Sequence, residues 1–152
     1  MRKIEVVSDK FRKYPDAETQ LPTRADVGSA GYDFYAPADI TMEKGKSVLI
    51  PTGIRSRIDD GWVLSIFPRS GLGFKHRVQL DNTVGIIDAD YYNSSNEGHI
   101  MIKLSCDAHD EGHKVSVFAG DGFAQGIFMP FGITVDDNAD GIRDGGFGST
   151  TK

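Results

Sequence analysis

Two short segments of the chain carry side chains that could bind an anion and activate a water molecule. In PRSGLGFK, residues 68–75, a guanidinium, a hydroxyl and a glycine follow one another at Arg69, Ser70 and Gly71. Free N–H groups at the start of a helix favour anions, and an arginine fork matches phosphate oxygens. The segment predicts a phosphate-binding turn, although an ordinary capped turn with an exposed arginine fits these residues equally well.

The second segment, GIIDADY, places a carboxylate directly after an apolar run. Asp88 follows Ile87, so its side chain should emerge where a strand ends. A carboxylate in that position could hold and deprotonate a water molecule beside a bound ligand, which makes Asp88 the candidate general base. Residue types alone also allow the blander interpretation that Asp88 and Asp90 are turn residues at the end of a strand.

Three further segments concentrate glycine with polar and aromatic residues. They are AGYDFYA (30–36), AGDGFAQGIF (119–128) and RDGGFGSTT (143–151). The last suggests a nucleotide-binding loop, but it lacks the G-x-x-x-x-G-K-[ST] spacing of a P-loop. A glycine-rich arm that closes over a ligand fits it better, and a disordered tail is the alternative.

Short strands must position these segments, because eighteen glycines and six prolines leave few windows for a helix of average length. GWVLSIFP and GHIMIKLS alternate with period two, which places the apolar side chains of each on one face. These side chains are Trp62, Leu64 and Ile66 in the first segment, and Ile100, Ile102 and Leu104 in the second. Further strands are expected in KIEVVS, GYDFYAP, KSVLIPTGI, VGIID, HKVSVFA and FAQGIFMP, and the only helix in RSGLGFK. The pattern predicts one all-β domain over residues 1–152, a barrel or sandwich, whose polar tail 136–152 is a mobile arm.

Composition excludes several classes of function. A formal net charge of -5 argues against a broad nucleic-acid face, and no apolar run is long enough for a signal peptide or membrane span. We therefore expect a cytoplasmic protein with no nucleic-acid or membrane partner. Cys106 has no partner for a disulfide and is expected to be a buried or half-buried strand residue. His109 and His113 have the spacing of metal-binding helices, but Gly112 argues against a helix and hence against zinc.

Taken together, the five glycine-rich and polar segments resemble the five ordered motifs of the trimeric dUTPase family. The resemblance covers nearly the whole chain. It implies a jelly-roll-like distorted barrel and an enzyme that cleaves dUTP to dUMP and pyrophosphate, which sanitises the nucleotide pool and supplies dUMP. It also implies a homotrimer in which the uracil hairpin, the phosphate motifs and the C-terminal arm of one active site come from three different subunits.

The resemblance assigns roles to individual residues. Asp88 would activate the water that attacks the α phosphorus, and Tyr91 would pack under the deoxyribose and exclude a 2′-hydroxyl. Residues expected to contact uracil are Asn82, Gly85, Ile86, Ile87 and Met101, with Phe147 stacking on the base. Residues expected to contact the phosphates are Arg69, Ser70, Gly71, Gln125, Arg143, Gly148, Ser149 and Thr150. Mg²⁺ would be held mainly by the phosphates and would touch Asp33 through water, because Mg²⁺ gives up its water reluctantly.

The chain departs from the family pattern at two places. Gly122 stands where many relatives have an arginine, so the source of that charge is open. An insertion, YNSSNE at residues 92–97, lengthens the hairpin after Tyr91. Two other functions are compatible with the resemblance: a sister enzyme of the dCTP deaminase branch, and a phage-type regulator that acts by binding a protein partner through the inserted segment.

Overall fold

Short antiparallel strands build the chain, as the glycine and proline spacing predicts. The structure is a computed structural model, and it describes residues 1–143 and 145–146. The strands are β1 (Lys3–Val6), β2 (Thr23–Arg24), β3 (Tyr32–Tyr35), β4 (Ile40–Glu43), β5 (Ser47–Pro51), β6 (Ile54–Arg57), β7 (Trp62–Pro68), β8 (Val78–Leu80), β9 (Gly85–Ile87), β10 (Met101–Cys106), β11 (Lys114–Val117) and β12 (Gly122–Pro130). The helices are α1 (Ser70–His76) and a 3-10 turn, η1 (Ala89–Asn93).

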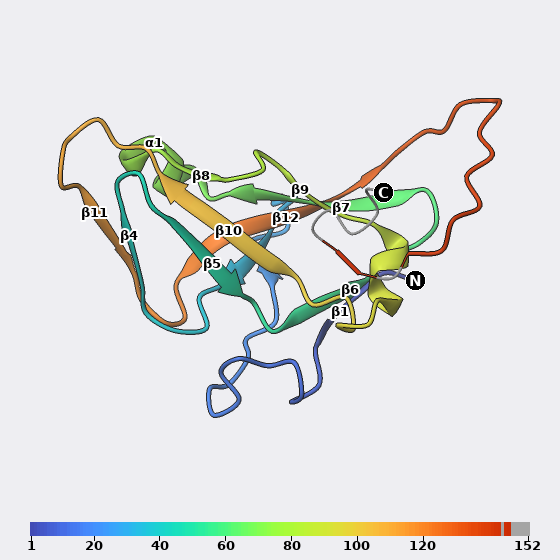
Figure 1. Cartoon of the computed structure of the whole chain (residues 1–152), viewed down its shortest axis with the longest axis horizontal. Coiled ribbons are helices and arrows are strands. Elements are labelled where there is room, and N and C mark those ends of the chain that lie inside the picture. Colours follow the sequence, from blue (N-terminus) through green and yellow to red (C-terminus); the bar gives the residue numbers. More distant parts are fainter. Residues whose placement is uncertain (144, 147–152) are drawn as a thin grey trace.

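The strands form four antiparallel sheets (Figure 1). The largest has the order β2-β3-β12-β7-β9, and a second has the order β5-β10-β8. Two pairs, β1-β6 and β11-β4, complete the arrangement. None of these sheets closes on itself within the part of the chain that the structure describes, so the fold is jelly-roll-like and all-β without a closed barrel.

The core confirms the period-two reading of the two longest alternating segments. Leu64 and Ile66 in β7 are buried, as are Ile102 and Leu104 in β10 and Ile100 just before it. Trp62 is only half-buried, because it lies at the first position of β7. Cys106 is buried, as expected.

Short elements that the sequence analysis did not predict complete the fold. They are β2, β4, β8 and η1. In β4, Ile40 and Met42 are buried and Thr41 is exposed, so the alternation exists but spans only one strand of four residues. The expected helix in RSGLGFK is present as α1, which ends at His76 and is followed by the C-cap residue Arg77, whose φ of 52° is left-handed. No helix in residues 1–143 or 145–146 is long and apolar enough to cross a membrane.

After β12 the chain leaves the sheets and then returns to them (orange to red in Figure 1). Residues 131–143 contain no helix or strand, and they bring Arg143 back to the region of β9 and η1. The arm that the sequence analysis placed at 136–152 is therefore described only in part. The predicted mobility of this arm stays a prediction.

Candidate functional site

A cavity of about 890 Å³ lies where β9, η1 and β10 meet. It collects most of the residues that the sequence analysis assigned to the base, the sugar and the attacking water. These are Asn82, Gly85, Ile86, Ile87, Asp88, Tyr91 and Met101, together with Arg143. A pocket of this size suits a small organic ligand.

Gly85 sets the position of the strand that forms one wall of this pocket. A Cβ atom at Gly85 would lie 3.0 Å from Cβ of Ile66, its partner in β7, so only glycine allows this close approach without a shift. β9 is the edge strand of its sheet. One edge of β9 pairs with β7, and the other edge carries backbone N–H and C=O groups that the pairing leaves available. Ile86 is about half exposed at this edge.

Asp88 follows β9 and carries an ion pair with the returning segment. Its Oδ2 atom lies 2.6 Å from Nη2 of Arg143, and Nε of Arg143 lies 3.3 Å from Oδ1 of Asp90. Asp88 is accessible, with 42% of its side chain exposed, so a water molecule can reach it. The placement at the end of a strand matches the sequence prediction.

Tyr91 forms a fixed, buried surface of the pocket. Its hydroxyl donates a hydrogen bond of 2.8 Å to the carbonyl oxygen of His99, and Nδ2 of Asn96 donates one of 2.8 Å to the same hydroxyl. Burial raises the pKa of Tyr91, and the Asn96 hydrogen bond opposes that rise. Tyr91 is therefore a neutral aromatic wall at physiological pH, with a hydroxyl that is already satisfied.

A second cluster of predicted residues lies at the other end of β7. Gln125 of β12 is paired with Asp33 of β3, and its Nε2 atom donates to the carbonyl oxygen of Pro68 at 3.2 Å. Nε of Arg69 lies 3.5 Å from Oδ1 of Asp33. Ser70 and Gly71 open α1 directly after Arg69, so their N–H groups lie at the end of β7, as the phosphate-turn prediction requires.

The two clusters lie at opposite ends of the β7-β9 strand pair. Ile87 is paired with Leu64, which places Asp88 beside Val63, six residues before Arg69. At about 3.3 Å per residue, the two backbones are roughly 20 Å apart. One chain therefore does not bring Asp88 and Arg69 onto the same phosphate group.

The space beside Gly122 is occupied by the side chain of Arg69. A Cβ atom at Gly122 would lie 2.5 Å from Nη1 of Arg69 and 3.3 Å from its Cζ. The guanidinium of Arg69 therefore lies against the bare backbone of Gly122. A positive charge is present at this position in the fold, but it comes from the neighbouring strand end.

Asp33 fits a water-mediated contact to a divalent cation and not a complete metal site. It is a single carboxylate that already has a guanidinium partner, Arg69. Within residues 1–143 and 145–146, no group of three or more His, Cys, Asp or Glu side chains could hold a metal ion. His76 Nδ1 and His113 Nε2 lie 3.0 Å apart, but they form only a pair. Hard oxygen ligands for Mg²⁺ would have to come largely from a bound phosphate chain.

Some predicted site residues lie outside the described part of the chain, and some residues that line the pocket were not predicted. Phe147, Gly148, Ser149 and Thr150 are outside the residues that the structure describes. Asn96 lines the pocket but was not predicted, since it lies in the inserted segment and no motif marks it.

Comparisons with known proteins show the family and the fold of the chain. Residues 17–151 match the family model described as dUTPase. The chain is 39% identical to the deoxyuridine 5′-triphosphate nucleotidohydrolase of Lactococcus lactis subsp. lactis (strain IL1403), over 99% of this chain and 97% of that protein. It is 42% identical to the protein of the same name from Pasteurella multocida (strain Pm70), over 89% of each. The crystal structure of dUTPase from Streptococcus mutans superimposes with a TM-score of 0.70 at 34% identity, covering 88% of this chain and 98% of that one.

The family match and the similarity to nucleotidohydrolases show that the chain is of a nucleotide-hydrolysing class of protein. Within that class, the chain belongs to the dUTPase family of enzymes.

Proposed function

We propose that the chain hydrolyses dUTP to dUMP and pyrophosphate by attack of a water molecule on the α phosphorus. The observation that carries the proposal is the convergence of Asp88, Tyr91 and the open edge of β9 on one pocket. Asp88 accepts a proton from the attacking water as general base, which contributes about 10²- to 10⁴-fold in rate. An enzyme with this activity acts on the deoxynucleotide pool, and we propose that it does so in the cytoplasm.

Uracil is recognised along the edge of β9. Backbone groups of Ile86 and Ile87 pair with the base edge much as a further strand would pair with β9. Asn82 adds a side-chain amide, and Met101 lies on the facing strand, β10. Cytosine presents the opposite donor and acceptor pattern at position 4 and is rejected, because it would leave a buried polar group unpaired.

The sugar is selected by shape. Tyr91 is 4% exposed, and its hydroxyl is hydrogen-bonded to the carbonyl oxygen of His99 and to Nδ2 of Asn96. A buried ring whose hydroxyl is held by two hydrogen bonds does not move aside for a 2′-hydroxyl. The proposal therefore expects dUTP to be cleaved and UTP to be excluded.

The phosphate chain is bound by the second cluster and the C-terminal arm. Arg69, Ser70, Gly71 and Gln125 contact the phosphates, with Ser70 near the oxygen that bridges the α and β phosphorus atoms. Arg143, Gly148, Ser149 and Thr150 hold the γ phosphate while Phe147 stacks on uracil. Asp33 would contact a Mg²⁺ ion through water, with the phosphates as the main ligands, and the ion would supply charge neutralisation for the leaving pyrophosphate. Each well-placed donor in such a dry site contributes on the order of 3 kcal/mol.

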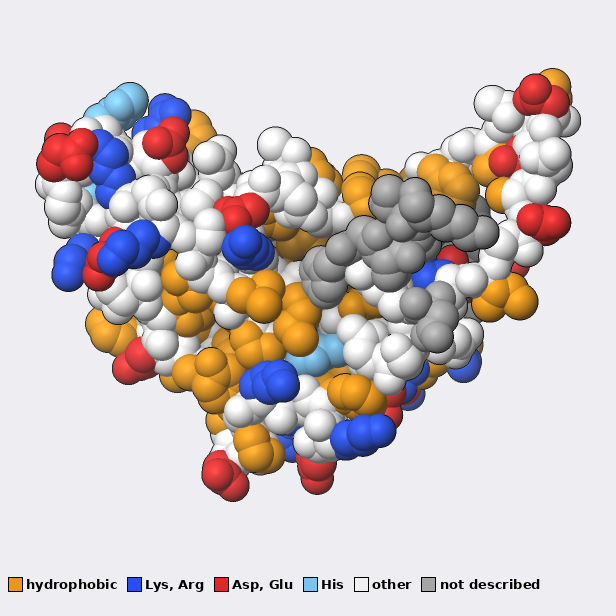
Figure 2. Space-filling view, viewed as in Figure 1, with side chains coloured by type: hydrophobic (Ala, Val, Ile, Leu, Met, Phe, Trp, Pro, Cys, Tyr) orange, Lys and Arg blue, Asp and Glu red, His pale blue; other side chains and the backbone are white. Residues whose placement is uncertain are grey.

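A homotrimer with shared active sites completes the proposal. Because Asp88 and Arg69 lie roughly 20 Å apart in one chain, a triphosphate reaches both kinds of group only when a second copy supplies one of them. Exposed apolar side chains are available for such a contact. Leu49 is 54% exposed and Phe74 is 91% exposed, and Figure 2 shows hydrophobic side chains at the surface around β5 and β10. Large exposed apolar patches mark protein interfaces.

The test measures pyrophosphate release from dUTP, dCTP, dTTP and UTP, with Mg²⁺ and with a chelator. Wild-type protein should release pyrophosphate from dUTP alone, and Asp88→Asn should lose about 10²- to 10⁴-fold in kcat. Asp60→Asn, an exposed aspartate before β7, is the matched control and should match the wild type. A folded wild-type protein that releases no pyrophosphate from dUTP would overturn the proposal.

A further inference from the structure

The inserted segment 92–97 is packed on its own chain. Arg55 Nη2 donates to the carbonyl oxygen of Tyr92 at 2.9 Å, and the Arg55 guanidinium carbon lies 3.7 Å from the centre of the Tyr92 ring. The Tyr92 hydroxyl donates to Oε2 of Glu5 in β1 at 2.7 Å. Ser94 is buried. These contacts fix the first half of the insertion against β1 and β6.

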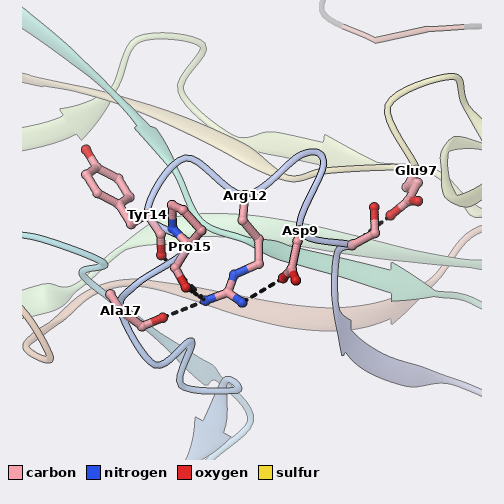
Figure 3. A network of polar contacts seen from close by, with 7 residues as sticks. Asp9, Arg12, Tyr14, Pro15, Ala17 and Glu97 are labelled. Carbon is pink, nitrogen blue, oxygen red and sulfur yellow. Dashed lines mark hydrogen bonds and ion pairs between the residues drawn. The ribbon is translucent and has the colours of Figure 1, made fainter.

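The second half of the insertion is fixed to the N-terminal segment. The backbone N–H of Ser8 donates to Oε2 of Glu97 at 2.8 Å (Figure 3). The same segment is folded around Arg12, which donates to Oδ1 of Asp9 and to the carbonyl oxygen of Ala17. Glu97 therefore meets a backbone that is itself ordered by local hydrogen bonds.

Between these two sets of contacts, Asn96 lines the pocket and forms hydrogen bonds through both its amide nitrogen and its amide oxygen. Its Nδ2 atom donates to the Tyr91 hydroxyl at 2.8 Å, and its Oδ1 atom accepts from the backbone N–H of Gly98 at 3.1 Å. Gly98 has a φ of +69°, and a Cβ there would lie 2.7 Å from the carbonyl oxygen of Tyr91. The turn after Asn96 thus packs directly on the backbone of Tyr91.

We infer that Asn96 is a positioning residue for sugar selection: it holds the Tyr91 ring in the plane that excludes a 2′-hydroxyl. The inference rests on the proposed function of the pocket and adds the insertion to it. Asparagine suits the role because it supplies one donor and one acceptor together. Aspartate would offer the Tyr91 hydroxyl no donor while ionised, and alanine would offer neither group.

The experiment compares binding of dUMP and UMP by calorimetry in wild type, Asn96→Ala, Tyr91→Phe and the double variant. Removing one hydrogen bond should cut the preference for dUMP over UMP by about 2- to 10-fold in Asn96→Ala. Asn93→Ala is the matched control, since Asn93 is an exposed asparagine of the same segment, and it should keep the wild-type preference. In the Tyr91→Phe background, which lacks the hydroxyl, Asn96→Ala should have no further effect.

An unchanged preference in Asn96→Ala would overturn the inference. The inference would also be overturned if Asn96→Ala lowered the preference for dUMP over UMP as much in the Tyr91→Phe background as in the wild type. Asn96 would then act without the Tyr91 hydroxyl. Hydrolysis of dUTP is measured separately on the same proteins. Its absence would overturn the proposed function, while the ratio of dUMP to UMP binding would still report on Asn96.

Discussion

The guanidinium of Arg143 lies on the carboxylate of Asp88, with 2.6 Å between Nη2 and Oδ2. The proposed general base is thus paired with the cation proposed for the γ phosphate. Asp88 still has 42% of its side chain exposed, so a water molecule can reach the carboxylate, but in this arrangement the Arg143 guanidinium is paired with Asp88 and not with a phosphate. A bound triphosphate, with more negative charge than one aspartate, would draw Arg143 away.

Replacing Arg143 by alanine should therefore damage catalysis more than folding. Losing one charged donor to the phosphates is expected to lower kcat/KM for dUTP by about 10²-fold. Steady-state rates of pyrophosphate release measure this. Ile142→Ala, a change at the exposed neighbouring residue, should behave as wild type. Equal activity of Arg143→Ala and wild type would remove Arg143 from the site.

Gly122→Ala tests the space that Arg69 occupies. The added methyl group would lie 2.5 Å from Nη1 of Arg69, so the flexible guanidinium must shift while the backbone stays in place. We expect a change in Tm of less than about 2 °C and a fall of about 10-fold in kcat/KM for dUTP. Gly132→Ala is the control, because nothing lies within 4 Å of a Cβ at that position. A large drop in Tm with normal activity would contradict the account of Gly122.

Subunit mixing tests whether active sites are shared. The Asp88→Asn and Arg69→Ala variants should each be nearly inactive, since each lacks one cluster. Random exchange of subunits should restore about a quarter of the wild-type activity, because that share of sites combines an intact hairpin with an intact phosphate cluster from different chains. If both clusters served a site within one chain, mixing would restore nothing.

His99 should make stability depend on pH. It is 1% exposed, and its Nε2 atom accepts a hydrogen bond from the backbone N–H of Gly53 at 2.9 Å. Burial, and to a smaller extent the charge of Lys13, lowers the pKa of His99 below its ordinary value of 6.5. The unfolded chain therefore binds a proton before the folded chain does. The contribution of neutral His99 is complete above pH 6.5 and is lost as the pH falls toward the lowered pKa of the folded state.

Thermal unfolding at pH 7.5 and pH 5 measures this effect. The wild type should lose on the order of 1 kcal/mol for each unit by which the pKa is lowered. His99→Gln removes the titrating group, so the difference in Tm between the two pH values should shrink. An equal difference in the variant would assign the pH dependence to other groups.

The sequence allowed prediction of those features that depend on local pattern. Alternation in β7 and β10 follows from burial of one face, and it needs no knowledge of the partner strands. β2 has only Thr23 and Arg24 and no such pattern, so its pairing with β3 was not predictable. The position of Asp88 at the end of β9 was predictable, because the residue follows a short apolar run directly in the sequence.

Features that depend on distant contacts were beyond the sequence. Asn96 acts on Tyr91 through a turn whose shape depends on Ser8 and Glu97, which are 89 residues apart along the chain. The contact of Arg69 with Gly122 likewise joins two strand ends that only the β7-β12 pairing brings together. Asp88 and Arg69 lie far apart because β9 runs antiparallel to β7. The three residues of β9 do not indicate this direction in the sequence.

Hydrolysis of dUTP in ¹⁸O-labelled water tests the central claim most directly, because it reports both the reaction and the atom attacked. Wild-type protein should convert dUTP to dUMP and pyrophosphate with the label in the phosphate of dUMP, and Asp88→Asn should lose this product. Label in pyrophosphate would place the attack on the β phosphorus and contradict the role given to Asp88. Release of no product by folded protein would contradict the proposed hydrolysis itself.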